Sequence, residues 1–295
     1  MSPVDGARSD LPPDLPSDGG SNSGSGGGSN SGSDSGSGGM SDSRPLLAAR
    51  GITKQFGGIV ALDHVDMDVA AGEAVGVVGP NGAGKTTLFN CLFGLEVPDE
   101  GTVVFDGKRI DRLPVWKRSR MGIGRTFQRM ELFEGMTVAD HLLVAEQAAS
   151  GTVRIWRDFV HRGGPTPAEL DHVKEVLDLL DIADLAGRPI DTLDLGHARL
   201  VELGRAMMGS PRLLMLDEPS SGLDADDTAR LSRILGESRR STGVAVVLVE
   251  HDLALVESAV DRLVVLNFGK VLATGGVDEV LAEPEVRVAY LGTTA

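Results

Sequence analysis

The chain has 295 residues and a formal net charge of −15, and most of the acidic excess lies after residue 45. An acidic body is a poor non-specific ligand for a nucleic acid backbone, so we expect no nucleic acid partner. The N-terminus lacks the basic and apolar segments of a signal peptide, and the longest apolar runs are far shorter than the roughly 20 residues of a membrane-spanning helix. A single cysteine, Cys91, excludes an internal disulfide and suits a reducing cytosol.

Residues 1–45 are predicted to form a disordered, Gly/Ser-rich tail. From Ser17 to Gly39 the sequence contains only Gly, Ser, Asn and Asp. Such a segment cannot bury enough apolar surface to offset the entropy lost on ordering. Residues 46–295 remain, and they suffice for one domain with a sizeable core.

The first elements of this domain are predicted to be short strands. Val65, Met67 and Val69 alternate with aspartates, which is typical of a half-exposed strand. Residues 74–78 are continuously apolar and read as a fully buried strand. Residues 102–105 precede an Asp-Gly pair and predict a strand that enters a tight turn. The pattern indicates a small antiparallel layer beside a parallel one.

The middle of the chain is predicted to be mainly helical. Residues 137–149 and 167–180 have helical character, and Thr166 with Glu169 makes a capping box at the start of the second helix. Buried strands return at residues 213–216, 244–249 and 263–266, separated by helical stretches. We therefore expect an α/β core interrupted by a helical insert at about 129–192.

A phosphate-binding loop follows the strand predicted at residues 74–78. The pattern G-x-x-x-x-G-K-[ST] is complete and precedes an apolar helix. Its residues are Gly79, Pro80, Asn81, Gly82, Ala83, Gly84, Lys85 and Thr86, followed by Thr87. Backbone N–H groups and a helix N-terminus bind phosphate oxygens, Lys85 is expected to bridge the β- and γ-phosphates, and Thr86 to ligate Mg²⁺. Alone, this loop leaves kinases, GTPases and ATPases open.

Two acids, Asp217 and Glu218, end the strand predicted at residues 213–216. In an α/β sheet the carboxyl end of a buried strand faces the nucleotide crevice. Asp217 is expected to hold Mg²⁺ through water. Glu218 is then free to orient and deprotonate the attacking water.

From about residue 46 to the C-terminus, these features resemble the ABC ATPases. The resemblance implies a P-loop NTPase core with an antiparallel β subdomain and a helical insert, and it implies ATP and Mg²⁺ as ligands. Phe56 matches the aromatic that stacks on adenine, and Gln128 matches the glutamine that contacts Mg²⁺ or the lytic water. Asp224 matches the residue that touches the opposite subunit, and His251 matches the histidine that contacts the γ-phosphate.

The resemblance also implies partners and a location. Residues 124–128, 131–133 and 136–138, together with 283–292, are similar to the ATPases of high-affinity branched-chain amino acid importers. Such an ATPase pairs with a second ABC ATPase subunit, identical or different, and works with transmembrane permease subunits as a cytoplasmic protein on the inner face of the membrane. A lipopolysaccharide-export ATPase shares parts of these segments. A soluble ABC ATPase of DNA repair or translation is a further alternative, although the single P-loop, acidic body and absence of heptads disfavour it.

The sequence departs from the family in its signature motif, usually L-S-G-G-Q. Here the segment reads Leu193-Asp194-Leu195-Gly196-His197. Gly196 is retained, so its N–H can face a phosphate of the opposite subunit's ATP. Asp194 can only accept hydrogen bonds and repels a triphosphate, although it suits the N-cap of the next helix. Our hypothesis is that the composite site using this signature is weakened.

Overall fold

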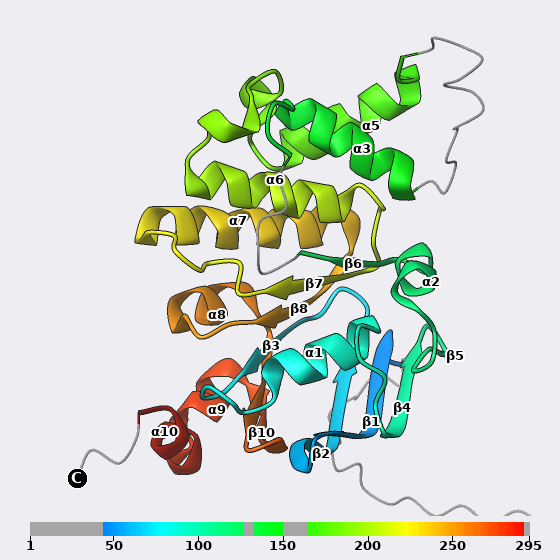
Figure 1. The fold of residues 1–295 in the computed structure, drawn as a ribbon. Coiled ribbons are helices and arrows are strands. Elements are labelled where there is room, and N and C mark those ends of the chain that lie inside the picture. The colour runs from blue at the N-terminus through cyan, green and yellow to red at the C-terminus, as the bar shows by residue number, and fades with distance from the viewer. Residues whose placement is uncertain (1–43, 127–132, 150–163, 292–295) are drawn as a thin grey trace, which may run out of the picture. The chain divides into compact units, whose positions relative to one another are not determined.

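The computed structural model describes residues 44–126, 133–149 and 164–291 (Figure 1). The predicted tail up to residue 43 and the candidate residue Gln128 lie outside these ranges.

The central sheet has six strands in the order β10-β9-β3-β8-β7-β6. β3 pairs in parallel with β8 and β9, β7 pairs in parallel with β6 and β8, and β10 joins β9 in antiparallel fashion at one edge. The strands are β3 (Ala74–Val78), β6 (Ile123–Arg125), β7 (Leu213–Asp217), β8 (Ala245–Val249), β9 (Arg262–Asn267) and β10 (Lys270–Gly276). The buried strands predicted from the apolar runs are therefore confirmed.

The middle strands of this sheet are apolar throughout because both of their faces are covered. In β8, Val246 and Leu248 belong to a core that includes α6 and α7 side chains, whereas Val247 and Val249 belong to a second core with α1. Successive side chains of a strand point to opposite faces, so a continuous apolar run supplies both cores.

A second sheet is antiparallel and has the order β2-β1-β4-β5. Its strands are β1 (Leu47–Phe56), β2 (Ile59–Val69), β4 (Glu100–Phe105) and β5 (Lys108–Arg109). Val65, Met67 and Val69 are buried, as the alternation predicted. Asp106 and Gly107 have φ of 47° and 73° between β4 and β5, the backbone of a tight hairpin turn. The predicted fold class, a parallel core with an antiparallel subdomain, is confirmed.

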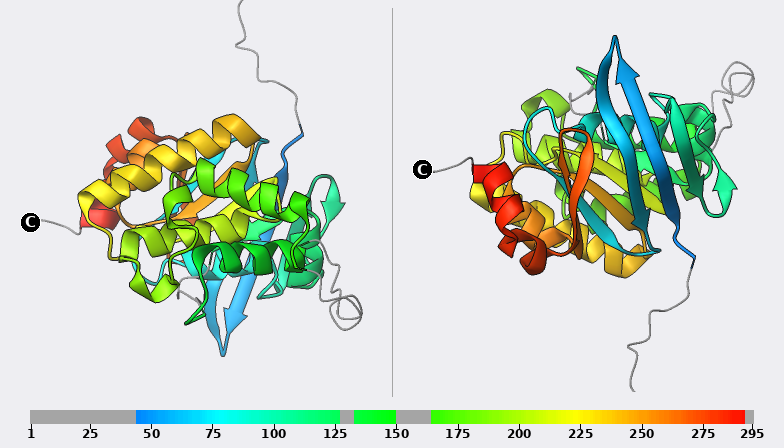
Figure 2. Two further views of the ribbon diagram at one scale, coloured as in Figure 1. Left: turned by 90° about the horizontal axis from the view of Figure 1, so that it is seen from above. Right: turned by 90° about the horizontal axis from the view of Figure 1, so that it is seen from below.

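Helices cover both faces of the central sheet (Figures 1 and 2). On one side lie α3 (Val138–Ala149), α5 (Pro167–Leu179), α6 (Leu195–Met207), α7 (Ala225–Thr242) and α8 (Leu253–Ala259), with the 3₁₀ turns η1 (Ala183–Leu185) and η2 (Ile190–Thr192). The other helices are α1 (Lys85–Phe93), α2 (Val115–Arg120), α9 (Val277–Ala282) and α10 (Pro284–Leu291). The predicted capping box is present, since Thr166 and Glu169 each bond the other's backbone N–H.

The strand register brings three loops to one edge of the sheet. Val77 of β3 lies opposite Val249 of β8, and Val249 lies opposite Asp217 of β7. Because these strands are parallel, the segments that begin at Gly79, Glu218 and Glu250 leave the sheet side by side.

Candidate nucleotide site

The loop between β3 and α1 requires glycine at two positions. Gly79 has φ of 148°, and a Cβ there would lie 2.1 Å from the carbonyl oxygen of Leu266. Gly84 has φ of 103°, and its Cβ would lie 2.6 Å from the carbonyl oxygen of Ala61. Only glycine adopts such a backbone without strain and admits such close neighbours. The predicted strand, loop and helix are all in place.

Lys85 lies folded over this loop. Its side chain is buried, and Nζ donates to the carbonyl oxygens of Gly79 at 2.7 Å and Pro80 at 3.1 Å. Burial lowers the pKa of Lys85, while the carboxylates of Glu218 and Asp217 act in the opposite direction. An ammonium group has three N–H donors. These two contacts therefore leave a donor for a phosphate oxygen.

Asp217 ends β7 and is 2% exposed. Its Oδ2 lies 3.2 Å from Nη2 of Arg125 in β6, and Nη1 of Arg125 donates to Oδ1 of Asn90 in α1 at 2.9 Å. Burial raises the pKa of Asp217, and the Arg125 charge only partly offsets this effect. The guanidinium also lies 4.7 Å from the centre of the Phe89 ring. Arg125 thus joins α1, β6 and β7, a role that sequence reasoning did not assign to it.

Glu218 and His251 approach each other at the ends of neighbouring strands. Oε1 of Glu218 lies 3.9 Å from Nδ1 of His251, and both side chains are partly exposed. Glu218 has a φ of 48°, and its N–H donates to the carbonyl oxygen of Val249 at 2.8 Å. This strained backbone holds the carboxylate at the tip of β7. The structure thus brings the two predicted catalytic side chains together.

Glu250, which sequence reasoning missed, lies between these two loops. It is fully buried, and its carboxylate accepts hydrogen bonds from Ser220 in one loop and from His251 and Asp252 in the other. The sequence signal was an acid directly after an apolar strand, which resembles an ordinary solvated strand end.

The candidate Mg²⁺ residues offer oxygen ligands. Thr86 presents a hydroxyl in the first turn of α1, and Asp217 presents a carboxylate at the end of β7. Within the residues that the structure describes, no group of three or more His, Cys, Asp or Glu side chains is arranged to hold a metal. Mg²⁺ commonly binds one or two protein oxygens and completes its shell with water and substrate phosphates. The donor set therefore fits a magnesium-nucleotide complex.

Phe56 lies at the end of β1 and is 44% exposed. Nζ of Lys54 lies 5.2 Å from the ring centre. The ring therefore has an accessible face, as stacking on a base requires. Cys91, by contrast, is fully buried in α1, and burial raises the pKa of its thiol to about 11, which confirms core packing.

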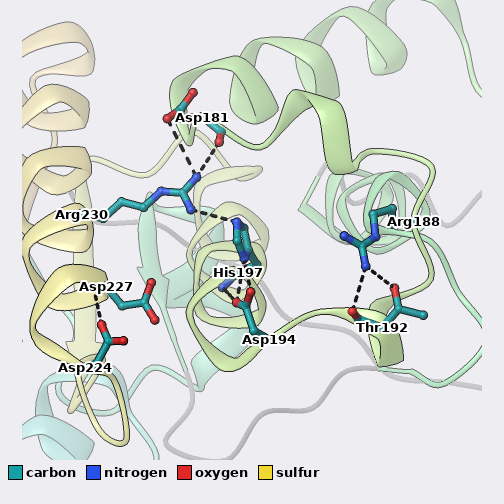
Figure 3. A network of polar contacts seen from close by, with 8 residues as sticks. All are labelled: Asp181, Arg188, Thr192, Asp194, His197, Asp224, Asp227 and Arg230. Carbon is teal, nitrogen blue, oxygen red and sulfur yellow. Dashed lines mark hydrogen bonds and ion pairs between the residues drawn. The ribbon is translucent and has the colours of Figure 1, made fainter.

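The signature segment forms the first turn of α6 (Figure 3). Oδ1 of Asp194 accepts the backbone N–H of His197 at 2.9 Å, so the predicted N-cap is confirmed. Nδ1 of His197 lies 2.7 Å from the same carboxylate, and its Nε2 lies 2.9 Å from Nη1 of Arg230. An arginine can only donate, so Nε2 accepts and Nδ1 carries the proton. Arg230 also donates to the carbonyl oxygen of Asp181 at 2.7 Å.

Two carboxylates flank the retained glycine of this turn. A Cβ on Gly196 would lie 2.5 Å from Oδ1 of Asp227, which leaves no room for a side chain. Asp227 belongs to the first turn of α7, which Asp224 caps by accepting the Asp227 N–H at 2.9 Å. Asp194 and Asp227 therefore place negative charge around the N-terminal turn of α6 (Figure 3).

A glycine-rich loop after β3 with a buried lysine folded over it, and an acid at the tip of β7 on the same sheet, define a P-loop nucleoside triphosphatase. The chain belongs to the ABC transporter family, whose model matches residues 62–221.

Relatives and solved structures extend this match over most of the chain. It is 39% identical over 257 residues to the high-affinity branched-chain amino acid transport ATP-binding protein BraF of Pseudomonas aeruginosa, with 85% of this chain and 99% of BraF covered. It is 38% identical over 253 residues to the LivG protein of Escherichia coli K12, with the same coverage. The ATP-binding cassette MJ1267, solved in its ADP conformation, matches with a TM-score of 0.75 and 31% identity over 85% of this chain and 100% of that chain. The chain is accordingly an ATP-hydrolysing cassette.

Among the described residues, no helix combines the length and apolar character that crossing a bilayer would require.

Proposed function

We propose that this chain hydrolyses magnesium-bound ATP on the inner face of the cell membrane and thereby drives import of branched-chain amino acids or similar small solutes through a separate permease. The observation that carries this proposal is the 38–39% identity to BraF and LivG over 99% of their lengths. The match extends over nearly the whole length of these relatives and is not confined to the nucleotide loop. The permease and its binding protein, rather than the ATPase, would select the solute.

The geometry of the site supports a separate role for each of its residues. Phe56 would stack on adenine, and the loop from Gly79 to Thr87 would hold the phosphates through backbone N–H groups and Lys85. Thr86 and Asp217 would hold Mg²⁺ together with Gln128. The bound ion would neutralise charge on the phosphate oxygens.

Hydrolysis requires a base and a group that contacts the γ-phosphate. Glu218 would take a proton from water as the water oxygen bonds to the γ-phosphorus and the bond to the ADP oxygen breaks. His251, 3.9 Å from Glu218, would contact the γ-phosphate. Both side chains leave the sheet at the edge where the phosphate loop begins.

A second ATPase subunit would complete each site. In this arrangement, ATP lies between the phosphate loop of one subunit and the signature turn of the other. Asp224 is exposed at the start of α7 and would contact that subunit, and the N–H of Gly196 would face its ATP. The second subunit is either a copy of this chain or a related ATPase.

A groove beside the central sheet would receive the permease. It has a volume of about 710 Å³ and runs between α2, β6, the end of α3 and α6. Small residues such as Ala145, Ala148 and Gly209 line it, and the half-exposed Trp116 stands at its margin. Small side chains let a helix approach closely, and exposed tryptophans are enriched in binding hot spots. We assign this groove to a helical segment of the permease.

Glu218→Gln tests the hydrolytic role. The amide accepts no proton, so turnover should fall by about 100-fold or more while ATP binding is kept. Single-turnover hydrolysis and binding of a fluorescent ATP analogue measure the two properties separately. Asp111→Asn, a carboxylate-to-amide change in a buried residue outside the site, serves as the control. Hydrolysis at the parental rate in Glu218→Gln would refute the assignment.

Purification from membranes tests the transport role. The tagged chain should co-purify with a multi-spanning permease, and the reconstituted complex should take up labelled leucine or valine into vesicles when ATP is present on the cassette side. Stimulation by lipopolysaccharide without amino acid uptake would instead support an exporter. Recovery without any membrane protein would favour a non-transport ATPase.

A further inference from the structure

The carboxylate of Glu250 bridges the two loops that carry Glu218 and His251. Its Oε1 accepts the backbone N–H of Ser220 at 2.8 Å and the Ser220 hydroxyl at 2.6 Å. Its Oε2 accepts the backbone N–H groups of His251 at 3.0 Å and Asp252 at 3.3 Å. Each oxygen therefore serves a different loop.

A buried charge of this kind is stable only when its hydrogen bonds are satisfied. Glu250 is 0% exposed, and it accepts hydrogen bonds from three backbone N–H groups and one hydroxyl. A carboxylate accepts at both oxygens and is planar and rigid. Its hydrogen bonds to both loops therefore fix the distance between them.

The distance between the two loops also sets the distance between His251 and Glu218. Nδ1 of His251 lies 3.9 Å from Oε1 of Glu218 and 3.9 Å from Oε2 of Glu250. The His251 N–H that binds Glu250 lies on the same residue as the imidazole. A shift of the Glu250 carboxylate consequently moves His251 relative to Glu218.

We propose that Glu250 is a positioning residue for ATP hydrolysis, which holds His251 in register with Glu218 through hydrogen bonds to both loops. The proposal rests on the proposed function, because it assumes that Glu218 and His251 act on ATP. Glu250 itself need not contact the nucleotide.

The chemistry of the four donors requires a carboxylate. Glutamine has the same length but only one accepting oxygen, and its NH₂ group can only donate. In Glu250→Gln, the NH₂ group must face either the Ser220 N–H or the N–H groups of His251 and Asp252. One loop therefore loses its anchor while the volume of the side chain stays the same.

The test compares Glu250→Gln with Asp111→Asn, which makes the same chemical change in a carboxylate that is 3% exposed and bonded to Arg109. We expect kcat to fall roughly 10- to 100-fold in Glu250→Gln, the effect of a misplacement of about 1 Å. The KM for ATP should change less than about threefold, since the phosphate loop is untouched. Asp111→Asn should keep both constants within about twofold of the parent.

A double-mutant cycle separates positioning from general damage. If Glu250 acts through His251, adding Glu250→Gln to His251→Ala should lower kcat by less than about threefold beyond His251→Ala alone. Fully multiplicative losses, or an unchanged kcat in Glu250→Gln, would overturn the proposal. Should Glu250→Gln not fold, Ser220→Ala takes its place, because it removes only the hydroxyl donor. It should lower kcat about two- to fivefold, and an unchanged kcat in that variant would overturn the proposal.

Failure of this inference is distinguishable from failure of the proposed function. Normal hydrolysis in Glu218→Gln would remove the catalytic assignment on which the inference rests. Loss of hydrolysis in Glu218→Gln with a normal Glu250→Gln variant would leave the proposed function standing and remove only the role of Glu250.

Discussion

At the scale of single residues, Arg125 affects the site through its ion pair with the buried carboxylate of Asp217. Both side chains are almost fully buried, at 6% and 2% exposure, so each pays a desolvation cost that the other partly offsets. The arginine is held by Asn90 and by the Phe89 ring, so its position does not depend on the carboxylate alone. A cation from a neighbouring strand thus favours the charged form of the acid expected to hold Mg²⁺, although burial still raises the pKa of that acid.

This pair predicts a pH dependence. Burial raises the pKa of Asp217 above its usual 3.8, so the carboxylate takes up a proton at a higher pH than an exposed aspartate. As the pH is lowered, the ATPase should therefore begin to lose activity at a pH that is still above 3.8. Arg125→Met removes the opposing charge and should move this acid limb to still higher pH. Profiles of kcat against pH measure the shift.

The matched control is Arg50→Met, which breaks an exposed pair with Asp68 on the antiparallel sheet. It should leave the acid limb in place. An Arg125→Met variant whose acid limb stays in place or moves to lower pH would contradict the role given to this arginine.

Replacement of Gly79 by alanine should lower the stability of the protein as well as its binding of nucleotide. A Cβ there would sit 2.1 Å from the Leu266 carbonyl oxygen, so Gly79→Ala must displace either β9 or the phosphate loop. We expect the free energy of unfolding to fall by about 2–4 kcal/mol. Gly135 also has a positive φ, of 80°, but nothing lies within 4 Å of its Cβ position. Gly135→Ala should cost only about 1 kcal/mol. Urea unfolding curves measure both, and equal losses would show that backbone strain alone decides.

At the scale of elements, α6 and α7 have aspartate caps at their first turns and are connected by a polar contact. Asp194 caps α6, Asp224 caps α7, and Arg230 of α7 bonds His197 of α6. The cap occupies the helix N-terminus that a phosphate would otherwise use. Asp227 adds a second carboxylate beside Gly196. The local structure thus supports our hypothesis of a weakened composite site without testing it.

Asp194→Ser tests this hypothesis while preserving the cap, since serine also caps helices well. Removal of one negative charge near the phosphates should raise turnover of the assembled ATPase about three- to tenfold. Thermal unfolding should stay nearly unchanged, which separates the electrostatic effect from helix stability. Turnover equal to that of the parent would show that the signature turn works as it stands.

At the scale of the molecule, the groove of about 710 Å³ lies between the central sheet and the helices that cover it. It is lined by β6, which carries Arg125, and by α6, whose first turn is the signature segment. A partner segment seated in the groove therefore lies against elements that lead to both halves of the nucleotide site. Such a position suits the transfer of movement between a cassette and a permease.

Trp116→Ala tests that coupling. Trp116 is 55% exposed, so loss of its ring should leave the fold intact and basal ATPase activity within about twofold of the parent. Binding to the permease and permease-stimulated hydrolysis should fall about tenfold or more. Leu170→Ala on α5, where the side chain is 48% exposed, is the control and should change neither. Full stimulation in Trp116→Ala would place the permease elsewhere.

Local sequence alone determined the buried strands, the phosphate loop, the capping box at Thr166 and the N-cap at Asp194. Each of these depends on residues a few positions apart, whose spacing already implies the backbone they adopt. The acid at the end of β7 followed in the same way, because parallel strands bring their carboxyl ends to one edge. The histidine after β8 was predicted only from the resemblance to ABC ATPases.

Only the tertiary structure decided which polar side chains meet. Glu250 lies 30 residues from Ser220, His197 lies 33 from Arg230, and Arg125 lies 92 from Asp217. No periodicity or motif reports such distances, since strand order and helix packing set them. The predicted residues supplied the chemistry of the site, and the packing of β6, β7 and β8 supplied the buried charges that hold it in place.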